Sequence, residues 1–248
     1  MPKLQKTAGV HFEKQLAEIT PEHKVILISL GGMAASQSHT ADDIQELSRR
    51  LENETIFSFW GEGHVVTRSR VIAKNIVAVA DTIKNRSGVE PRIIMVGKSM
   101  GGHKLWRTCH RLNKLGKQVD LFIGVDVSGS VSRHHQDFID SCGEEGAHWF
   151  HKNVKSLYGF YQTTPNEIQT GAPLFYYRSQ DETYYNVPPE KDGAINIQVY
   201  QTPFNTETCM PDEESGDPIT NQIVTHATID TNKPLLQIIE KLVKKAIS

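Results

Sequence analysis

Three predominantly apolar runs constrain the fold more than any other feature of this sequence. They are Lys24–Leu30 (KVILISL), Arg92–Val96 (RIIMV) and Asp120–Val127 (DLFIGVDV). A continuous apolar run of this length is typical of a strand whose two faces are both buried. Such strands occur mainly in parallel sheets that helices cover. The runs therefore predict the interior of an α/β protein.

Segments with helical periodicity alternate with these runs, and a further strand is predicted over Thr55–Trp60. A helix is predicted over residues 40–53. In three other segments the apolar residues recur at steps of three or four and form one stripe on a helix. These stripes are Ile72, Ile76, Val79 and Ile83; Leu105, Cys109 and Leu112; and Leu235, Ile238, Ile239 and Leu242. The alternation predicts a compact α/β fold with a mostly parallel central sheet and helices on both faces.

The second half of the chain alternates less regularly. Its strand candidates are Asn153–Tyr161, Leu174–Ser179 and Ile195–Tyr200. Residues 128–152 are polar and contain several glycines and histidines, and we interpret them as a lid or an insertion. No linker divides the 248 residues. We therefore expect a single domain over residues 1–248.

Composition excludes several classes of function. The net charge of −2 gives no basic footprint for nucleic acid, and 38% apolar residues are enough for a large core. No apolar stretch reaches transmembrane length. The first residues lack the apolar core of a secretory signal, and the three cysteines match no metal or redox spacing. We expect a cytoplasmic protein, with secretion by a route that needs no signal left open.

One serine stands at a junction between a strand and a helix. Gly97-Lys98-Ser99-Met100-Gly101 has the pattern G-x-S-x-G, and it directly follows the strand predicted over Arg92–Val96. Such a sharp turn lifts the serine hydroxyl above the sheet and turns the first amides of the helix toward the same space. The full patterns of phosphate-binding glycine loops are missing at this junction. The alternative is a tight connection with an inert serine. We favour a nucleophile.

The G-x-S-x-G turn at residues 97–101, called the elbow from here on, and the order of the elements resemble the α/β-hydrolase family. The resemblance covers roughly residues 24–247, although only the elbow is specific. The resemblance implies a nucleophilic serine, then an acid, then a histidine along the chain. The family's histidine lies between the last strand and the last helix. Among the eleven histidines, His226 in IVTHATID has that position. An imidazole suits the task because its pKa lies near neutrality.

Two aspartates are candidates for the acid. Most α/β hydrolases take it from a later strand, which favours Asp181, whereas pancreatic-type lipases take it from the strand after the elbow strand, which favours Asp126. The segments VDLFIGVD, NVKSLYGFYQ and HATID are also similar to a group of lipase-like hydrolases with the acid in the second arrangement. In that group a proline usually follows the aspartate, and here Val127 does. We prefer Asp126 and keep Asp181 as the alternative.

The same resemblance implies an oxyanion hole made of two backbone amides. One belongs to Met100, directly after the nucleophile, and the other to Met33 or Gly32 in the loop that follows the first strand. A Gly-Gly turn without catalytic function is the alternative for that loop. No cofactor is implied. The histidines at 134, 135, 148 and 151 fit no metal-ligand spacing, so we expect no metal.

These features together predict a serine hydrolase that cleaves a carboxylic ester or thioester through an acyl-enzyme on Ser99. Its partner would be a small-molecule or lipid-like acyl substrate, with no nucleic acid involved. Two alternatives stay open: an acyltransferase that uses the same triad, and a binding protein that keeps the fold without turnover. The sequence does not indicate the oligomeric state.

Overall fold

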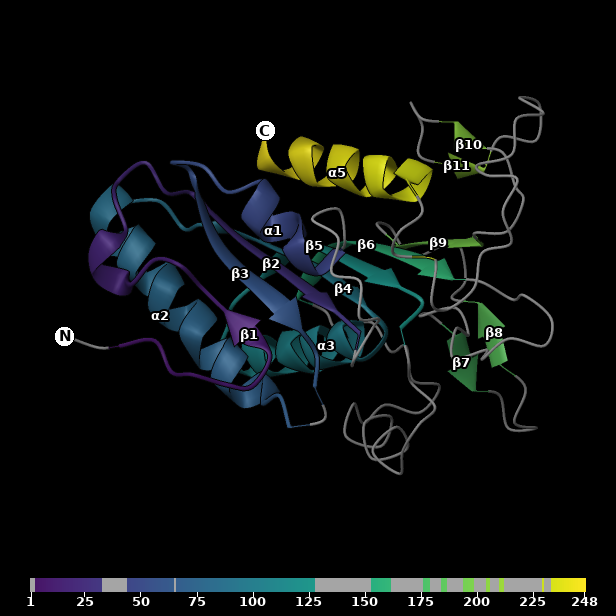
Figure 1. Cartoon of the computed structure of the whole chain (residues 1–248), viewed down its shortest axis with the longest axis horizontal. Helices are drawn as coiled ribbons and strands as arrows, with labels where there is room; N and C mark the ends of the chain where they lie inside the picture. Colours follow the sequence, from purple (N-terminus) through teal and green to yellow (C-terminus); the bar gives the residue numbers. More distant parts are fainter. Residues whose placement is uncertain are drawn as a thin grey trace.

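The computed structural model describes residues 3–32, 44–64, 66–127, 153–161, 229 and 233–248, together with five short strand segments between 176 and 211. At its centre is a seven-stranded sheet in the order β1-β3-β2-β4-β5-β6-β9 (Figure 1). Its strands are β1 (Val10–His11), β2 (Val25–Gly31), β3 (Ile56–Glu62), β4 (Arg92–Lys98), β5 (Val119–Val125), β6 (Val154–Tyr161) and β9 (Ala194–Gln198).

The sheet is parallel except at one edge, where β1 pairs with β3 in antiparallel register. Ile26, Leu27 and Ile28 of β2 all have zero exposure, so both faces of this strand are buried. The prediction of a mostly parallel sheet, drawn from the apolar runs, is confirmed. The strands begin and end within a few residues of their predicted limits, because a buried parallel strand requires an uninterrupted apolar run.

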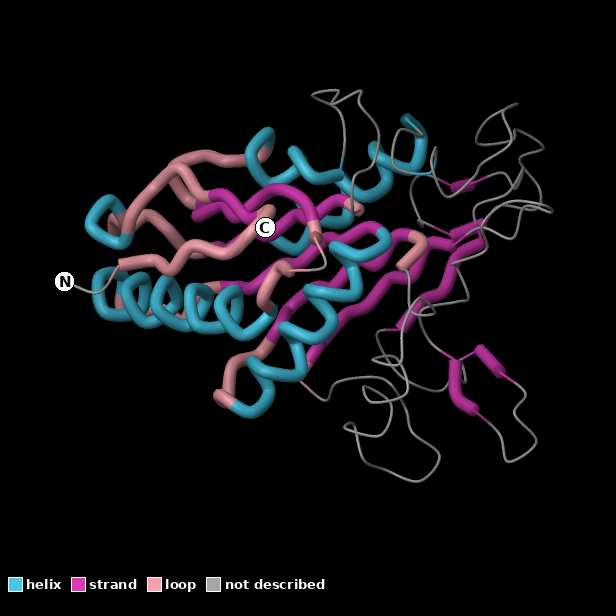
Figure 2. The backbone as a smooth tube through the Cα atoms, turned by 60° about the horizontal axis from the view of Figure 1, so that its bottom comes forward, coloured by secondary structure: helices cyan, strands magenta, loops and turns pink. Residues whose placement is uncertain are grey.

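Helices cover both faces of the sheet, and each face has its own apolar core (Figures 1 and 2). One core contains residues of α2 (Ser69–Ser87) and α3 (Ser99–Lys114). The other contains residues of α1 (Leu47–Arg50) and α5 (Lys233–Ile247). Two 3-10 turns, η1 (Leu16–Glu18) and η2 (Ile44–Glu46), precede β2 and α1. The predicted apolar stripes are confirmed, since their members are buried.

The helix predicted over residues 40–53 is shorter than expected. The structure describes the turn η2 followed by the single helical turn of α1, and residues 40–43 lie outside the described ranges. The hydroxyl of Ser48 donates to the carbonyl oxygen of Phe59 at 2.5 Å, and the hydroxyl of Ser29 donates to that of Ser48 at 2.8 Å. These contacts attach α1 to the sheet and take the place of helix length as the source of its stability.

The second half differs most from expectation. Of the predicted strand Leu174–Ser179, β7 covers Tyr176–Arg178, and it pairs with β8 (Tyr184–Asn186) in a separate two-stranded sheet. A second small sheet joins β10 (Phe204–Asn205) and β11 (Met210–Pro211). Residues 128–152, interpreted as a lid or insertion, lie outside the described residues. Within the described part of the chain, none of the helices combines the length and the hydropathy needed to cross a membrane.

Candidate active site

Ser99 begins helix α3 directly after the end of β4. The preceding residue, Lys98, is still extended, with φ of −101° and ψ of 144°, whereas Ser99 has a φ of +49°. Only two described residues other than glycine have a positive φ, and Ser99 is one of them. Such a conformation costs about 1–2 kcal/mol for a residue with a β-carbon, so the surrounding structure must hold it in place. This is the strained turn that the sequence pattern predicts.

Three glycines permit the close packing of this turn. A β-carbon at Gly97 would lie 2.5 Å from the α-carbon of Gly102, and one at Gly102 would lie 2.5 Å from the Val127 side chain. A β-carbon at Gly101 would overlap the carbonyl oxygens of Leu30 and Gly31, at the end of β2. The first turn of α3 therefore lies directly against the ends of β2 and β4. The glycines of the motif are required by contact with backbone atoms.

Asp126 stands in the equivalent position on the next strand. β4 and β5 are paired with Lys98 opposite Val125, and Ser99 and Asp126 are the residues that follow this pair. Asp126 is completely buried, has a φ of +42°, and donates its backbone N–H to the carbonyl oxygen of Phe160 at 2.7 Å. The carboxyl ends of parallel strands meet at one edge of a sheet, so Asp126 and Ser99 share this edge.

The proposed oxyanion donors are described in part. Met100 lies in the first turn of α3, where the amides of a helix have no partner within the helix itself. Gly32 is buried and directly follows β2, whose end contacts Gly101. Met33 lies outside the described residues. The described part of the structure thus brings Gly32 and Met100 to the same edge.

Two other predicted site residues, His226 and Asp181, also lie outside the described residues. The chain near His226 is anchored at one point, because Ile229 is fully buried in the core that contains Val96 of β4 and Val125 of β5. These are the strands that end at Ser99 and Asp126. The strand before Asp181, β7, pairs with β8 and is not part of the seven-stranded sheet.

Sequence reasoning missed the burial of two lysines near Ser99. Lys98 is 2% exposed and is among the largest fully buried side chains, and Lys104 of α3 is 9% exposed. Burial lowers the pKa of Lys104, and the nearby Arg107 lowers it further. Lysine is almost never fully buried unless it is paired, so the residue type alone does not predict that these two side chains are buried. A signal was available for Lys98, since it lies inside the G-x-S-x-G motif between a buried strand and Ser99.

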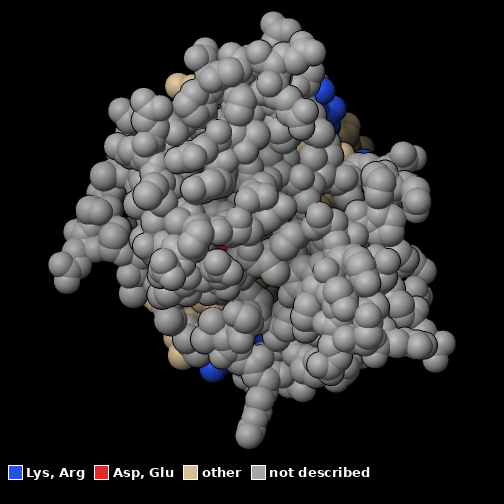
Figure 3. Space-filling model, turned by 90° about the vertical axis from the view of Figure 1, so that its right-hand side faces the viewer, with Lys and Arg blue, Asp and Glu red and all other residues tan. Residues whose placement is uncertain are grey.

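Within the described ranges, no group of three or more histidine, cysteine, aspartate or glutamate side chains is arranged to hold a metal ion. Figure 3 views the molecule from the side toward which the strands run. Described lysine and arginine side chains are visible there at the upper right and the lower left, and in part near the lower centre. Cys109 of α3 is fully buried, and burial raises the pKa of its thiol above the usual value, so it is not a reactive thiolate.

No protein-family model and no curated protein matches the sequence. Solved structures are similar to it. The iron-lacking apo form of ESTFA has a TM-score of 0.50 at 10% identity, covering 99% of this chain and 83% of that chain. Lipase B of Aspergillus fumigatus has a TM-score of 0.48 at 12% identity, and the match covers 94% of this chain and 66% of the lipase. Est1E from Butyrivibrio proteoclasticus has a TM-score of 0.47 at 12% identity, with 99% and 98% coverage.

At 10–12% sequence identity, the similarity between this chain and these structures is a similarity of fold alone. The sheet, with six parallel strands and one antiparallel edge strand, has the strained serine at the end of a central strand and helices on both faces. The similarity to ESTFA extends over nearly the whole chain. This protein has the α/β-hydrolase fold.

Proposed function

We propose that this protein is a serine hydrolase that cleaves a carboxylic ester or thioester. The observation that carries the proposal is the positive φ of Ser99 at a strand-to-helix turn closed by three glycines. A backbone conformation that costs free energy persists where function requires it, and this turn presents a hydroxyl at the edge where the parallel strands end. ESTFA, Est1E and the fungal lipase have similar folds, which fits the reaction class without identifying a substrate.

In the proposed reaction, the Ser99 hydroxyl oxygen attacks the acyl carbon and His226 accepts the hydroxyl proton. The tetrahedral oxyanion is stabilised by the backbone amides of Met100 and of Met33 or Gly32. As the oxyanion collapses, the bond to the leaving group breaks and His226 returns the proton to it. Water then attacks the acyl-enzyme by the same route and releases the acid.

Asp126 is the proposed acid that orients His226 and stabilises the imidazolium. Its support is its burial and its position beside Ser99 at the ends of paired strands. His226 precedes the anchored Ile229 by three residues, so chain geometry limits their α-carbons to a separation of about 11 Å. Ile229 packs in the core that contains residues of β4 and β5, which is compatible with an imidazole at the edge where these strands end. Asp181 remains the alternative acid.

The remaining features belong to the same proposal. The proposal includes a single domain over residues 1–248, with residues 128–152 as a lid or an insertion. The substrate is a small or lipid-like acyl compound, the reaction uses no metal or organic cofactor, and the protein acts in the cytoplasm. An acyltransferase would use the same acyl-enzyme, with an alcohol in place of water.

Hydrolysis of p-nitrophenyl butyrate and of a butyryl thioester tests the proposal. We expect turnover by the full chain and its loss in Ser99→Ala. Ser87→Ala is the matched control, because Ser87 ends α2 and bonds locally to Val89. Activity that survives Ser99→Ala would overturn the proposal. Product analysis with added methanol separates the two enzymes: an acyltransferase would transfer most of the acyl group to the alcohol.

A further inference from the structure

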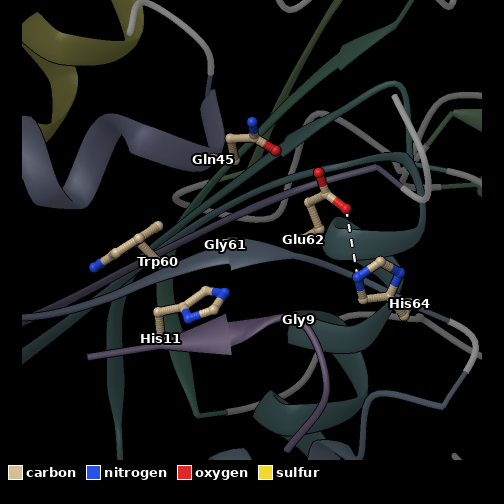
Figure 4. A pocket seen from close by; sticks show the side chains of 7 residues that line it. All are labelled: Gly9, His11, Gln45, Trp60, Gly61, Glu62 and His64. Atoms are coloured by element: carbon tan, nitrogen blue, oxygen red, sulfur yellow. Dashed lines mark ion pairs between the residues drawn. The ribbon is translucent and has the colours of Figure 1, made fainter. Parts of the chain in front are cut away.

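A pocket of about 250 Å³ lies at the β1–β3 edge of the sheet, outside the proposed catalytic residues. It is lined by Gly9, His11, Gln45, Trp60, Gly61, Glu62 and His64. Glu62 ends β3, and its carboxylate lies 3.4 Å from Nε2 of His64. Across the pocket, the His11 ring stacks on Trp60 with centroids 4.7 Å apart, and Gln45 completes the wall (Figure 4).

Hydrogen bonds that need no ligand hold the frame of this pocket in place. The hydroxyl of Thr67 donates to the carbonyl oxygen of Ala8 at 2.7 Å and accepts the backbone N–H of His64 at 2.9 Å. The N–H of Glu62 donates to the carbonyl oxygen of Gly9 at 2.7 Å. These bonds join the segment before β1 to the segment after β3. The backbone that carries the lining side chains is therefore largely preformed. Less conformational entropy is lost when a ligand binds to it.

Two glycines allow the backbones of β1 and β3 to approach each other closely beside the pocket. Gly9 and Gly61 have φ values of +77° and +136°, which residues with a β-carbon rarely adopt. A β-carbon at Gly9 would overlap the carbonyl oxygen of Glu62 and approach the His64 ring to 2.5 Å. A β-carbon at Gly61 would overlap the carbonyl oxygen of Gly9. The pocket therefore depends on two positions where only glycine fits.

The chemistry of the lining selects the class of ligand. Glu62 only accepts hydrogen bonds, whereas Gln45 and a neutral imidazole both donate and accept. A cation could bind only to the acceptors of this lining and not to its donors, and an anion would be repelled by the Glu62 carboxylate. Hydroxyl groups donate and accept at the same atom. The rings of His11 and Trp60 add an apolar wall suited to the C–H groups of a carbohydrate ring.

We infer that this pocket binds one hydroxyl-rich ring, of the size of a monosaccharide or cyclitol. Its volume lies below the range of about 300–1,000 Å³ that is usual for drug-sized ligands, so it accommodates a single ring. The pocket also adjoins the elbow. The N–H of Gly63 donates to the carbonyl oxygen of Gly31 at 3.0 Å, and a β-carbon at Gly63 would lie 2.5 Å from Gly101. Binding does not depend on the proposed catalysis.

Two-dimensional amide NMR of the full chain, titrated with D-glucose and with myo-inositol, tests this inference. We expect saturable shifts of the amides of Gly9, Gly61, Glu62 and His64, with a dissociation constant in the millimolar range that is normal for a fragment. Glu62→Gln keeps the shape but replaces charge-assisted hydrogen bonds by neutral ones, and should weaken binding about tenfold. His64→Phe keeps a ring and removes both nitrogens, with a similar expected loss.

Two variants serve as controls. Glu54→Gln makes the same chemical change at an exposed position before β3, at the opposite end of that strand, and should leave binding unchanged. Ser99→Ala should also leave it unchanged, so a failure of the hydrolase proposal is distinguishable from a failure of this one. The inference is overturned by the absence of saturable shifts, by equal binding in Glu62→Gln, or by preferential binding of tetramethylammonium or inorganic phosphate at these amides.

Discussion

Ser99 and Asp126 occupy matching positions at the ends of two paired strands. Each directly follows one member of the Lys98–Val125 pair, and each has a positive φ, of 49° and 42°. No other described residue with a β-carbon has such a conformation. Both side chains thus leave the sheet at the same edge from strained backbone. This relationship supports the assignment of Asp126 more strongly than sequence similarity does.

The strain at Ser99 predicts a stability difference between two variants at this position. Glycine adopts a positive φ without steric cost, whereas alanine pays for its β-carbon as serine does. Ser99→Gly should therefore be more stable than Ser99→Ala by about 1 kcal/mol in the free energy of unfolding. Urea denaturation at neutral pH measures the difference. Equal stability, or a less stable glycine variant, would mean that the backbone at residue 99 is not strained.

Replacement of Asp126, the proposed acid, should lower the rate of hydrolysis without unfolding the protein. Asparagine tolerates a positive φ and has the shape of aspartate, but it cannot stabilise an imidazolium. We expect Asp126→Asn to reduce kcat for p-nitrophenyl butyrate by about 10²–10⁴. Asp181→Asn, the same change at the alternative acid, should have a far smaller effect. The reverse ranking of the two variants would assign the acid to Asp181.

Gly101 should tolerate no side chain, because a β-carbon there overlaps two carbonyl oxygens of β2. Backbone atoms cannot move aside as the end of a side chain can. Gly101→Ala should therefore cost at least about 3 kcal/mol, the upper end of the usual cost of overpacking. Gly116→Ala is the control, since Gly116 has a positive φ but open space around it. Thermal and urea unfolding compare the two, and a milder effect at Gly101 than at Gly116 would contradict the packing described for the elbow.

His23 should make stability depend on pH. It is 3% exposed, its Nδ1 accepts the backbone N–H of Thr20 at 3.0 Å, and its pKa is lowered chiefly by burial and also by Lys14. Because the folded pKa lies below the unfolded value of about 6.5, the unfolded chain binds more protons as the pH falls past that value. The contribution of neutral His23 to the free energy of unfolding is therefore complete above pH 6.5 and is lost progressively below it.

Urea unfolding at pH 8 and pH 5.5 tests this expectation. The wild-type protein should lose more stability between these two values than His23→Gln, whose amide oxygen can still accept the Thr20 N–H but does not titrate. An identical loss in both proteins would remove His23 as a cause of the pH dependence.

The first half of the fold was predictable because local patterns of apolar residues determine its strands and helices. Strands buried on both faces require apolar runs, and helices that cover a sheet require a stripe of apolar residues on one face. The sequence therefore predicts β2, β4, β5, α2 and α3. The elbow was predictable because close contacts at Gly97, Gly101 and Gly102 permit only glycine, which leaves a recognisable pattern in the sequence.

The features that were not predictable depend on tertiary contacts. β1 has only two residues and exists because it pairs with the edge of β3. The predicted strand Leu174–Ser179 has suitable residues, but its place outside the main sheet depends on pairing with β8, which no local pattern reveals. The pocket at Glu62 and His64 is formed by residues from three elements, and its polar members resemble ordinary surface residues in the sequence.

Labelling with a fluorophosphonate probe tests the central claim most directly, because the probe reacts with a serine only when a base and an oxyanion hole activate it. Folded wild-type protein should be labelled at Ser99, as located by mass spectrometry of its peptides. Labelling should vanish in Ser99→Ala and persist in Ser87→Ala. Folded protein that stays unlabelled, or that carries the label on a different residue, would contradict the assignment of Ser99 as the nucleophile.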